Sequence, residues 1–299
     1  AAAFAAYTAK HCLDWIRRAV GSPEVAAEIL SVGTWTMNAT VASAFRQSPV
    51  LLAGDAAHQL PPTGGFGMNT GVQDVHNLAW KIAGVLEGWA GPAILDSYDA
   101  ERRPVARTNA DRSLENSRMV GRINRTAIES GGDSASAVAA SRRYGNFTGM
   151  DLGFRYERGA LVPDGTAAPE VPDPVIDYAP TARPGHRAPH LALDYQGREI
   201  STLDFFDGAF TLLAGAGGRD WCDASRTVAR SLNAPLHAYI VGPGGDLRDP
   251  DDRWLDLYGV SRAGAVLVRP DGHVGWRSAG GVPDREAELS TALRRILAR

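Results

Sequence analysis

The sequence has little of several features that mark particular classes of protein. Its two cysteines, Cys12 and Cys222, are far apart and form no metal-binding pattern. This argues against a disulfide framework and against a metal site, and it fits a reducing, cytoplasmic location. No apolar run approaches the ~20 residues that cross a bilayer. No membrane-spanning segment is therefore expected.

Positive charge is also limited. Lysine occurs only at Lys10 and Lys81, and the formal net charge is −3. A basic surface for nucleic acid or for an anionic membrane is therefore not expected. The remaining positive charge is arginine, which together with abundant alanine and glycine indicates a GC-rich bacterial genome.

What is present is typical of a globular protein. The 299 residues predict about two domains, and the contents of 44% apolar and 22% charged residues are ordinary. The start, "AAAFAAYTAKHCLDWIRRAVG", lacks a basic segment ahead of its apolar part and predicts an amphipathic helix over 3–20. The sequence has no initiator methionine and opens within that pattern. We therefore expect a portion of a longer protein.

Apolar periodicity predicts the elements of the first half. Residues 24–47 are β-like, and "PVLLAG" at 49–54 has the continuous apolar character of a strand buried on both faces. A helix is predicted over 67–87, and another from Gly91-Pro92 that Pro104 should kink or interrupt. The predicted apolar face of the first of these helices consists of Val72, Val75, Ala79, Ile82 and Leu86.

A change of composition marks a domain boundary. Seven prolines occur in the 31 residues from Gly159 to Pro189, which is typical of a semi-rigid linker. After it the sequence predicts two strands around a helix over 210–242, a hairpin over 264–278 with Asp271-Gly272 at its turn, and a closing helix over 284–299.

The loop after "PVLLAG" carries the most chemistry. Asp55 follows the end of a predicted strand, where open α/β sheets place their ligands, and its carboxylate can accept hydrogen bonds from sugar-type hydroxyls. An isolated Asp at this position is also a common turn or N-cap residue. Pro61 and Pro62 stiffen the loop. His58 can serve as an acid or base, but packing or hydrogen bonding within the loop is the simpler interpretation.

Glycines then lead into the helix. Gly64, Gly65 and Gly67 let the backbone approach a flat ring closely. Met68 and Asn69 lie in the first turn, where unpaired N–H groups attract negative charge. The segment "GFGMNT" narrowly misses G-x-G-x-x-G, because Thr70 is in the last place.

Taken together, "LLAGDAAHQLPPTGGFGMNTGVQDVHNLAWKIAGVLEG" and "ILDSYDAERRPVA" closely resemble the flavin-dependent aromatic-ring hydroxylases. These are single-component, FAD-dependent monooxygenases of the p-hydroxybenzoate hydroxylase type, and the phenol, chlorophenol and aromatic polyketide hydroxylases are the most similar branch. The strong likeness runs from about Val50 to Ala106. In this family NADH or NADPH reduces the flavin, and a flavin C4a-hydroperoxide then hydroxylates an electron-rich phenol.

The resemblance implies roles for particular residues. Asp55 would bind the ribityl chain of FAD, and the N–H groups of Met68 and Asn69 would face the N1–C2=O end of the isoalloxazine ring. The residues implied to lie along the ring edge are Pro62, Gly64, Gly65 and Gly67. Trp35 and Met37 occupy the place of the substrate-covering sheet, so one of them is a candidate substrate contact, although core packing is the alternative. A catalytic acid or base is not identified.

The family's N-terminal βαβ fold with a true G-x-G-x-x-G is not found in this sequence. We therefore expect an α/β chain that contains part of the p-hydroxybenzoate hydroxylase-type FAD-binding fold, with the N-terminal dinucleotide-binding half absent and required as a partner. The expected domains are a remnant of the substrate-covering domain (1–46), the C-terminal part of the FAD-binding domain (47–158), a linker (159–187) and a thioredoxin-like domain (188–299).

The thioredoxin-like domain is expected not to cycle a dithiol. Trp221-Cys222 lies where thioredoxins have their motif, but the second position is Ser225, and Gly264 replaces the usual cis-proline. Arg226 could still lower the pKa of Cys222 and leave a reactive lone thiol. The main hypothesis is a hydroxylase portion that is inactive alone and acts on a small aromatic substrate. The alternatives are a non-catalytic binding or homodimerisation module and a thiol oxidoreductase.

Overall fold

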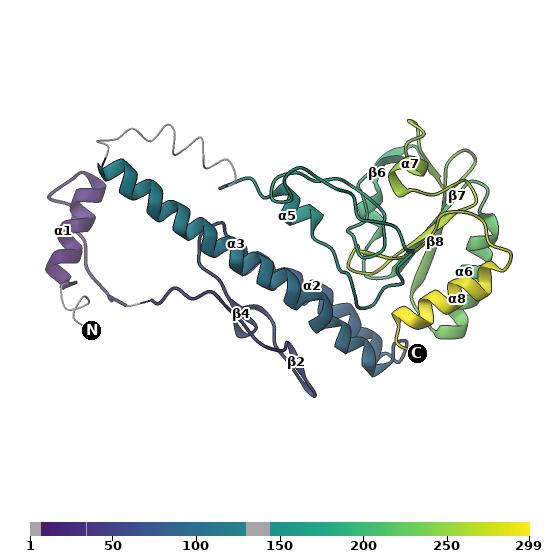
Figure 1. Cartoon of the computed structure of the whole chain (residues 1–299), viewed down its shortest axis with the longest axis horizontal. Coiled ribbons are helices and arrows are strands. Elements are labelled where there is room, and N and C mark those ends of the chain that lie inside the picture. The colour runs from purple at the N-terminus through teal and green to yellow at the C-terminus, as the bar shows by residue number, and fades with distance from the viewer. Residues whose placement is uncertain (1–6, 34, 130–143) are drawn as a thin grey trace. The chain divides into compact units, whose positions relative to one another are not determined.

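The computed structural model describes residues 7–33, 35–129 and 144–299, and side chains at 123–129 are not described. The chain divides into two compact units, Ala1–Asn38 and Ala39–Arg299, and Figure 1 labels many of their elements. None of the described helices combines the length and apolar composition needed to cross a membrane.

The first unit contains one described helix, α1 (Ala9–Val20), as predicted for 3–20. Thr8 caps its start by accepting a hydrogen bond from the His11 N–H, and Gly21 ends it in the left-handed conformation. Residues 21–33 and 35–38 form no strand, so the β-like prediction for 24–47 is wrong over this range.

In the second unit the strands next to the predicted loop are short. They are β1 (Thr40–Val41), β2 (Arg46–Gln47), β3 (Val50–Leu51) and β4 (His58–Gln59). β1 pairs with β4 and β2 pairs with β3, both antiparallel. The prediction of a strand buried on both faces at 49–54 is wrong, because β3 has β2 as its one described partner and Val50 is exposed.

Two helices follow and pack side by side: α2 (Phe66–Leu86), and α3 (Asp96–Glu129), which the short helix η3 (Pro92–Leu95) precedes. α2 agrees with the predicted range of 67–87 to within one residue. α3 continues through Pro104 without interruption. A short helix, α5 (Thr148–Gly153), lies further along the chain.

The C-terminal region is built on one seven-stranded sheet of order β11-β10-β7-β8-β9-β5-β6. β7 (Phe210–Gly215) and β8 (Leu236–Val241) are parallel and joined by α6 (Arg219–Leu232). β10 (Ala265–Val268) and β11 (Val274–Ser278) form the predicted hairpin, with Gly272 at positive φ. The remaining elements are β5 (Ala192–Tyr195), β6 (Arg198–Ser201), η4 (Thr202–Phe205), β9 (Leu247–Arg248), α7 (Trp254–Tyr258) and α8 (Arg285–Ile296).

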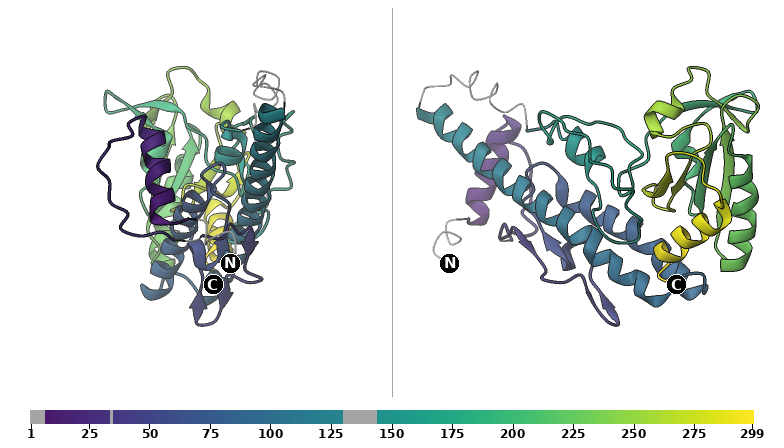
Figure 2. Two further views of the ribbon diagram at one scale, coloured as in Figure 1. Left: turned by 90° about the vertical axis from the view of Figure 1, so that its left-hand side faces the viewer. Right: turned by 45° about the vertical axis from the view of Figure 1, so that its right-hand side comes forward.

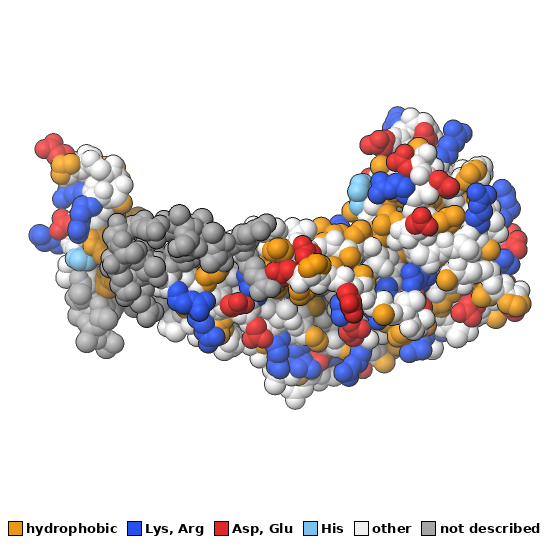
Figure 3. All heavy atoms as spheres, turned by 45° about the horizontal axis from the view of Figure 1, so that its top comes forward, with side chains coloured by type: hydrophobic (Ala, Val, Ile, Leu, Met, Phe, Trp, Pro, Cys, Tyr) orange, Lys and Arg blue, Asp and Glu red, His pale blue; other side chains and the backbone are white. Residues whose placement is uncertain are grey.

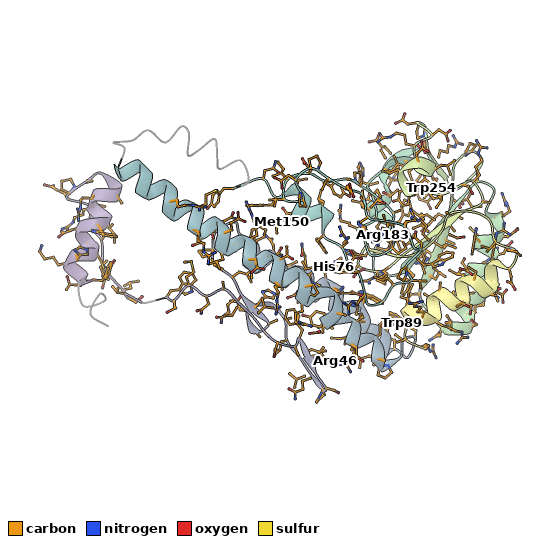
Figure 4. All side chains as sticks on the ribbon, viewed as in Figure 1. Arg46, His76, Trp89, Met150, Arg183 and Trp254 are labelled. Atoms are coloured by element: carbon orange, nitrogen blue, oxygen red, sulfur yellow. The ribbon has the colours of Figure 1, made fainter. Side chains whose placement is uncertain are left out.

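Apolar packing joins this sheet to α2 and η3. α6 and α8 lie side by side against one face of the sheet (Figure 2), and their cluster with β7 also contains Trp80, Trp89 and Ile94. The ring of Phe210 is 5.6 Å from that of Trp80, edge to face. Trp89, labelled in Figure 4, follows the end of α2. The two parts of the second unit therefore share one core.

The proline-rich segment is tied to this core by backbone hydrogen bonds. The N–H groups of Val162 and Gly185 donate to Gly275 and Val274 of β11, at 2.8 Å in both cases. Val162 and Gly185, near the two ends of residues 159–187, thus lie beside the edge strand β11. The domain boundary placed in this segment stays a prediction.

Candidate functional site: the glycine loop and its buried supports

The loop predicted to hold the flavin lies between β3 and α2. Asp55 is exposed on the short helix η2 (Gly54–Ala56), and it does not cap that turn, whose N-cap is Ala53. Pro62 is exposed, whereas Pro61 is buried. α2 packs against η2, and a Cβ on Gly71 would lie 3.1 Å from the Gly54 Cα. The acidic turn and the start of α2 are therefore neighbours.

The start of α2 has the features of an anion- and ring-binding backbone. Gly65 is its N-cap in the left-handed conformation, and no side chain caps the first turn. A Cβ built on Gly65 or Gly67 would meet nothing within 4 Å, whereas one on Gly64 would clash with the Phe66 ring at 2.6 Å. Gly64 is thus required by packing inside the chain. Gly65 and Gly67 instead leave open space beside uncapped N–H groups, and this arrangement fits a flat anionic group.

Met68 and Asn69 lie in that first turn, as predicted, and both side chains are exposed. The Asn69 side chain donates to the Gly65 carbonyl at 2.9 Å. Trp35 and Met37 belong to the first unit and are 70% and 48% exposed. Neither side chain belongs to an apolar core cluster of the described residues, and the choice between substrate contact and core packing stays a prediction.

His58 contacts helix α2, whereas the simpler interpretation placed its packing or hydrogen bonding within the loop. His58 is buried, and its Nε2 lies 2.6 Å from Asp74 Oδ2 on α2. The same carboxylate accepts hydrogen bonds from the Gly54 N–H at 3.3 Å and from Arg102 Nε of α3 at 2.9 Å. Asp74 therefore fixes the N-terminal side of the loop. His76, expected to be solvated, is exposed.

The C-terminal side of the loop is held by α3. The Ser113 hydroxyl is buried and lies within hydrogen-bond distance of the carbonyl oxygens of Pro61 and Thr63, at 2.6 and 3.1 Å. The Thr63 hydroxyl donates to the Ser113 carbonyl at 2.6 Å. Sequence reasoning missed Asp74 and Ser113. Asp74 lies within the recognised motif, but Ser113 lies outside it and no local pattern marked it.

A second buried cluster joins these helices to the sheet. The Glu101 carboxylate of α3 accepts from Lys81 Nζ of α2 at 2.7 Å and from Arg269, after β10, at 2.8 and 2.9 Å. Arg269 also pairs with Asp271, and Asn77 donates to Glu101 at 2.6 Å. The four charged side chains are fully or almost fully buried and balance two positive charges with two negative ones.

The pKa values in this cluster follow from its surroundings. Burial alone would raise the pKa of Glu101, but Arg269 and Lys81 lower it to about 2. Burial lowers the pKa of Lys81 to about 8 against the attraction of Glu101. Both pKa shifts are consistent with an ionised Glu101–Lys81 pair that is shielded from water. Burial of the two charges costs free energy, and their attraction to opposite charges offsets that cost.

Comparison with known proteins identifies the chain. Residues 4–113 match the family model of an FAD binding domain, and residues 181–299 match that of the C-terminal region of aromatic-ring hydroxylases. The chain belongs to the FAD-dependent aromatic-ring hydroxylases. Its membership confirms the resemblance carried by the glycine loop.

Relatives of this hydroxylase chain include 4-methyl-5-nitrocatechol 5-monooxygenase of a Burkholderia species, 40% identical over 99% of this chain and 52% of the relative. A putative polyketide hydroxylase of Streptomyces halstedii is 42% identical over 97% and 51%. Among solved structures, the flavin-dependent monooxygenase PieE, in complex with FAD and substrate, is 37% identical with a TM-score of 0.86, covering 98% of this chain and 55% of PieE. The chain thus spans about half the length of these relatives.

Cys222 of this hydroxylase chain differs from the expectation of a reactive thiol. Burial raises its pKa to about 11, and the smaller lowering by Arg226 does not compensate. Arg226 is instead paired with Asp223. The thiol is therefore neutral near pH 8, and the prediction that Arg226 leaves it with a lowered pKa is wrong.

The burial and raised pKa of Cys222 predict how fast each of the two cysteines reacts with a thiol reagent. In a Cys12→Ser variant at pH 8, Cys222 should react with a chromogenic disulfide at least about 100-fold more slowly than after unfolding in urea. Cys12 is only half-buried and should react much faster in a Cys222→Ser variant. Stopped-flow absorbance measures both rates. Equal rates in the folded and unfolded Cys12→Ser chain would contradict this account.

A buried histidine within the proline-rich segment, His186, predicts acid sensitivity. Burial, Arg183 and Arg155 lower the pKa of His186 to about 4. Between pH 6.5 and 4 the unfolded chain therefore binds a proton at this histidine that the folded chain does not, so the free energy of unfolding falls as pH falls, by about 2 kcal/mol from this residue. Urea unfolding across this range measures the slope. His186→Gln should reduce it, whereas His237→Gln, at an exposed position, should leave it unchanged; equal slopes would refute the assignment.

Proposed function

We propose that this chain is the portion of an FAD-dependent monooxygenase that holds the flavin ring, and that the complete enzyme hydroxylates a phenolic or aromatic polyketide substrate. The observation that carries the proposal is the uncapped start of α2 beside open space at Gly65 and Gly67, next to the exposed Asp55. Relatives named as polyketide hydroxylases and dichlorophenol monooxygenase support the substrate class.

The residues have distinct roles in this proposal. FAD, when bound and reduced by NADH or NADPH, supplies the oxygen-activating chemistry. Asp55 binds the ribityl hydroxyls, and the N–H groups of Met68 and Asn69 stabilise negative charge at the N1–C2=O side of the ring. Pro62 and the glycines, Gly64 included, border the ring edge. Trp35 or Met37 contacts the aromatic substrate.

The C-terminal region is proposed to be a thioredoxin-like domain without redox activity. Its support is the order β11-β10-β7-β8, with β7 and β8 parallel and β10 and β11 antiparallel, and with α6 and α8 on one face. Ser225 at the second motif position and the high pKa of Cys222 argue for a structural role. This domain and residues 1–46, as part of a substrate-covering domain, complete the proposed organisation.

Flavin uptake tests the proposal. The chain is produced together with the half of the Streptomyces halstedii hydroxylase that it does not match, and bound FAD is measured by absorbance and fluorescence. Gly67→Val should abolish uptake, because its side chain would enter the proposed ring space, yet it meets nothing within 4 Å in this chain. Gly121→Val, also an open helical glycine, is the matched control. Unchanged uptake with Gly67→Val would refute the placement of the ring. A folded complex without FAD would favour a non-catalytic binding module.

A further inference from the structure

Two adjoining cavities lie where α3, α5 and the proline-rich segment meet. The larger has a volume of about 200 Å³ and the smaller one of about 60 Å³. Both are lined by the same four residues, Gly149, Gly153, Arg155 and Pro174, so they lie side by side. None of the residues proposed to hold FAD lines either cavity. The function assigned to the glycine loop therefore leaves these cavities unexplained.

Apolar side chains line much of the larger cavity. Val105 is buried on α3, Met150 lies on α5 and is labelled in Figure 4, and Phe154 directly follows α5. Pro104 and Pro174 also line it. A dry cavity of about 150 Å³ is large enough to bind benzene. The larger cavity therefore has room for one substituted aromatic ring, and a methionine sulfur and a phenyl ring are favourable neighbours for it.

Polar groups face the smaller cavity. His186 is 6% exposed, and its Nδ1 has no hydrogen-bond partner among the described residues. Arg155 uses its Nε–H for Glu157, and its guanidinium has further N–H donors. The carboxylate of Asp177 lines the cavity as well. Because a buried polar atom without a partner costs free energy, the histidine favours a ligand that can bond to it.

The groups around His186 favour a neutral hydroxyl over an acid. Burial, Arg183 and Arg155 hold the pKa of His186 at about 4, so at neutral pH its ring has one donor and one acceptor nitrogen. A hydroxyl can both donate and accept, so it can bond to either nitrogen and also accept from Arg155. A carboxylate can only accept, and the carboxylate of Asp177 would repel it.

The composition of this site differs from that of the surface around the C-terminal region. On the face seen in Figure 3, side chains of both charges are interspersed there, as expected for a solvated surface. The two cavities instead combine an apolar lining with a few polar groups at one end. This combination is typical of sites that bind small molecules.

We propose that the two cavities together form a binding site for a single-ring phenol. The ring occupies the larger cavity beside Phe154, and the hydroxyl lies in the smaller cavity between Arg155 and His186. The inference does not rest on the proposed function, because it needs neither FAD nor the glycine loop. Phenols are also the substrate class proposed for the complete enzyme, so this site would bind a substrate or product at a second place.

Ligand binding to the chain alone, without FAD, tests the proposal. The probe is 4-fluorophenol at neutral pH, followed by fluorine NMR, and it should bind with a Kd of about 1 mM or lower. The matched ligand 4-fluorotoluene lacks the hydroxyl. It should bind at least about 10-fold more weakly, because it leaves His186 unpaired. The anion 4-fluorobenzoate should also bind at least about 10-fold more weakly, because it meets Asp177.

A matched pair of variants tests the location of the site. Thr108 lines the larger cavity from an exposed position of α3, and its hydroxyl donates to the Pro104 carbonyl at 3.2 Å. Thr108→Phe should obstruct the cavity and weaken 4-fluorophenol binding by about 10-fold or more. Thr291 is exposed on α8, and its hydroxyl donates to the Ala287 carbonyl at 2.8 Å. Thr291→Phe is therefore the control and should leave binding unchanged, and the Tm of both variants should stay close to that of the parent chain.

Each outcome supports or overturns the site. It is overturned if the Kd of 4-fluorophenol exceeds about 10 mM, if 4-fluorotoluene binds equally well, or if Thr108→Phe has no more effect than Thr291→Phe. Stronger binding of 4-fluorobenzoate would assign the cavities to an acid and would overturn the proposal as well. Flavin uptake is measured separately, on the complex with the unmatched half, so its failure and the failure of phenol binding are distinguishable.

Discussion

Replacing Glu101 with glutamine should lower the free energy of unfolding by about 3–5 kcal/mol. The neutral amide keeps the shape of the side chain but removes the negative charge that compensates Lys81 and Arg269. Both cations are fully buried, so they cannot regain water without local unfolding. Urea unfolding followed by circular dichroism measures the loss.

Two further variants separate charge from shape. Asp223→Asn removes the exposed partner of the exposed Arg226 and should cost less than about 1 kcal/mol. Adding Lys81→Met to Glu101→Gln removes the excess positive charge and should recover at least about 1 kcal/mol. If Glu101→Gln cost no more than Asp223→Asn, the charges of the buried cluster would not stabilise the chain as described above.

Asp74→Asn is expected to lower the free energy of unfolding by about 3 kcal/mol and to loosen the loop before α2. The substitution removes the charge that holds Arg102 at 2.9 Å, and it weakens the acceptor shared by His58 and the Gly54 N–H. Unfolding in urea gives the stability, and amide hydrogen exchange at Gly54 and His58 reports the loop. Flavin uptake should fall in parallel.

The control variant and a double-mutant cycle for this prediction use residues of α2 and α3. Asp111→Asn changes an exposed carboxylate of α3 and should have little effect on either measurement. Arg102→Gln should lose a similar amount of stability to Asp74→Asn. The double variant should lose clearly less than the sum, because both changes remove one ion pair. Strict additivity would show that the two residues act independently.

The sequence predicted the elements whose signals are local. The boundaries of α2 follow from the glycines before it and from its period, and the β10–β11 hairpin follows from Asp271-Gly272 between two apolar runs. The strand prediction at 49–54 failed for a different reason. An apolar run indicates that a segment is buried, but it does not show against what. A strand forms only where a neighbouring strand pairs with its backbone hydrogen-bonding groups.

The buried supports of the loop could not be predicted in this way. Glu101 and Arg269 are separated by 168 positions, and no local pattern connects them. On α2, the spacing of Asp74, Asn77 and Lys81 does indicate a polar face, but such a face is ordinarily solvated. Only the fold shows that it is covered by α3 and by the residues after β10.

The charge cluster that joins α2, α3 and β10 limits how this protein can be recombined with its relatives. A chimera that exchanges only the region after the proline-rich segment would place a foreign residue opposite Lys81 and Glu101 wherever the donor lacks Arg269 or Asp271. An exchange of parts should therefore carry all four positions together, and a library cut at residues 159–187 should yield folded hybrids mainly from parents that share them.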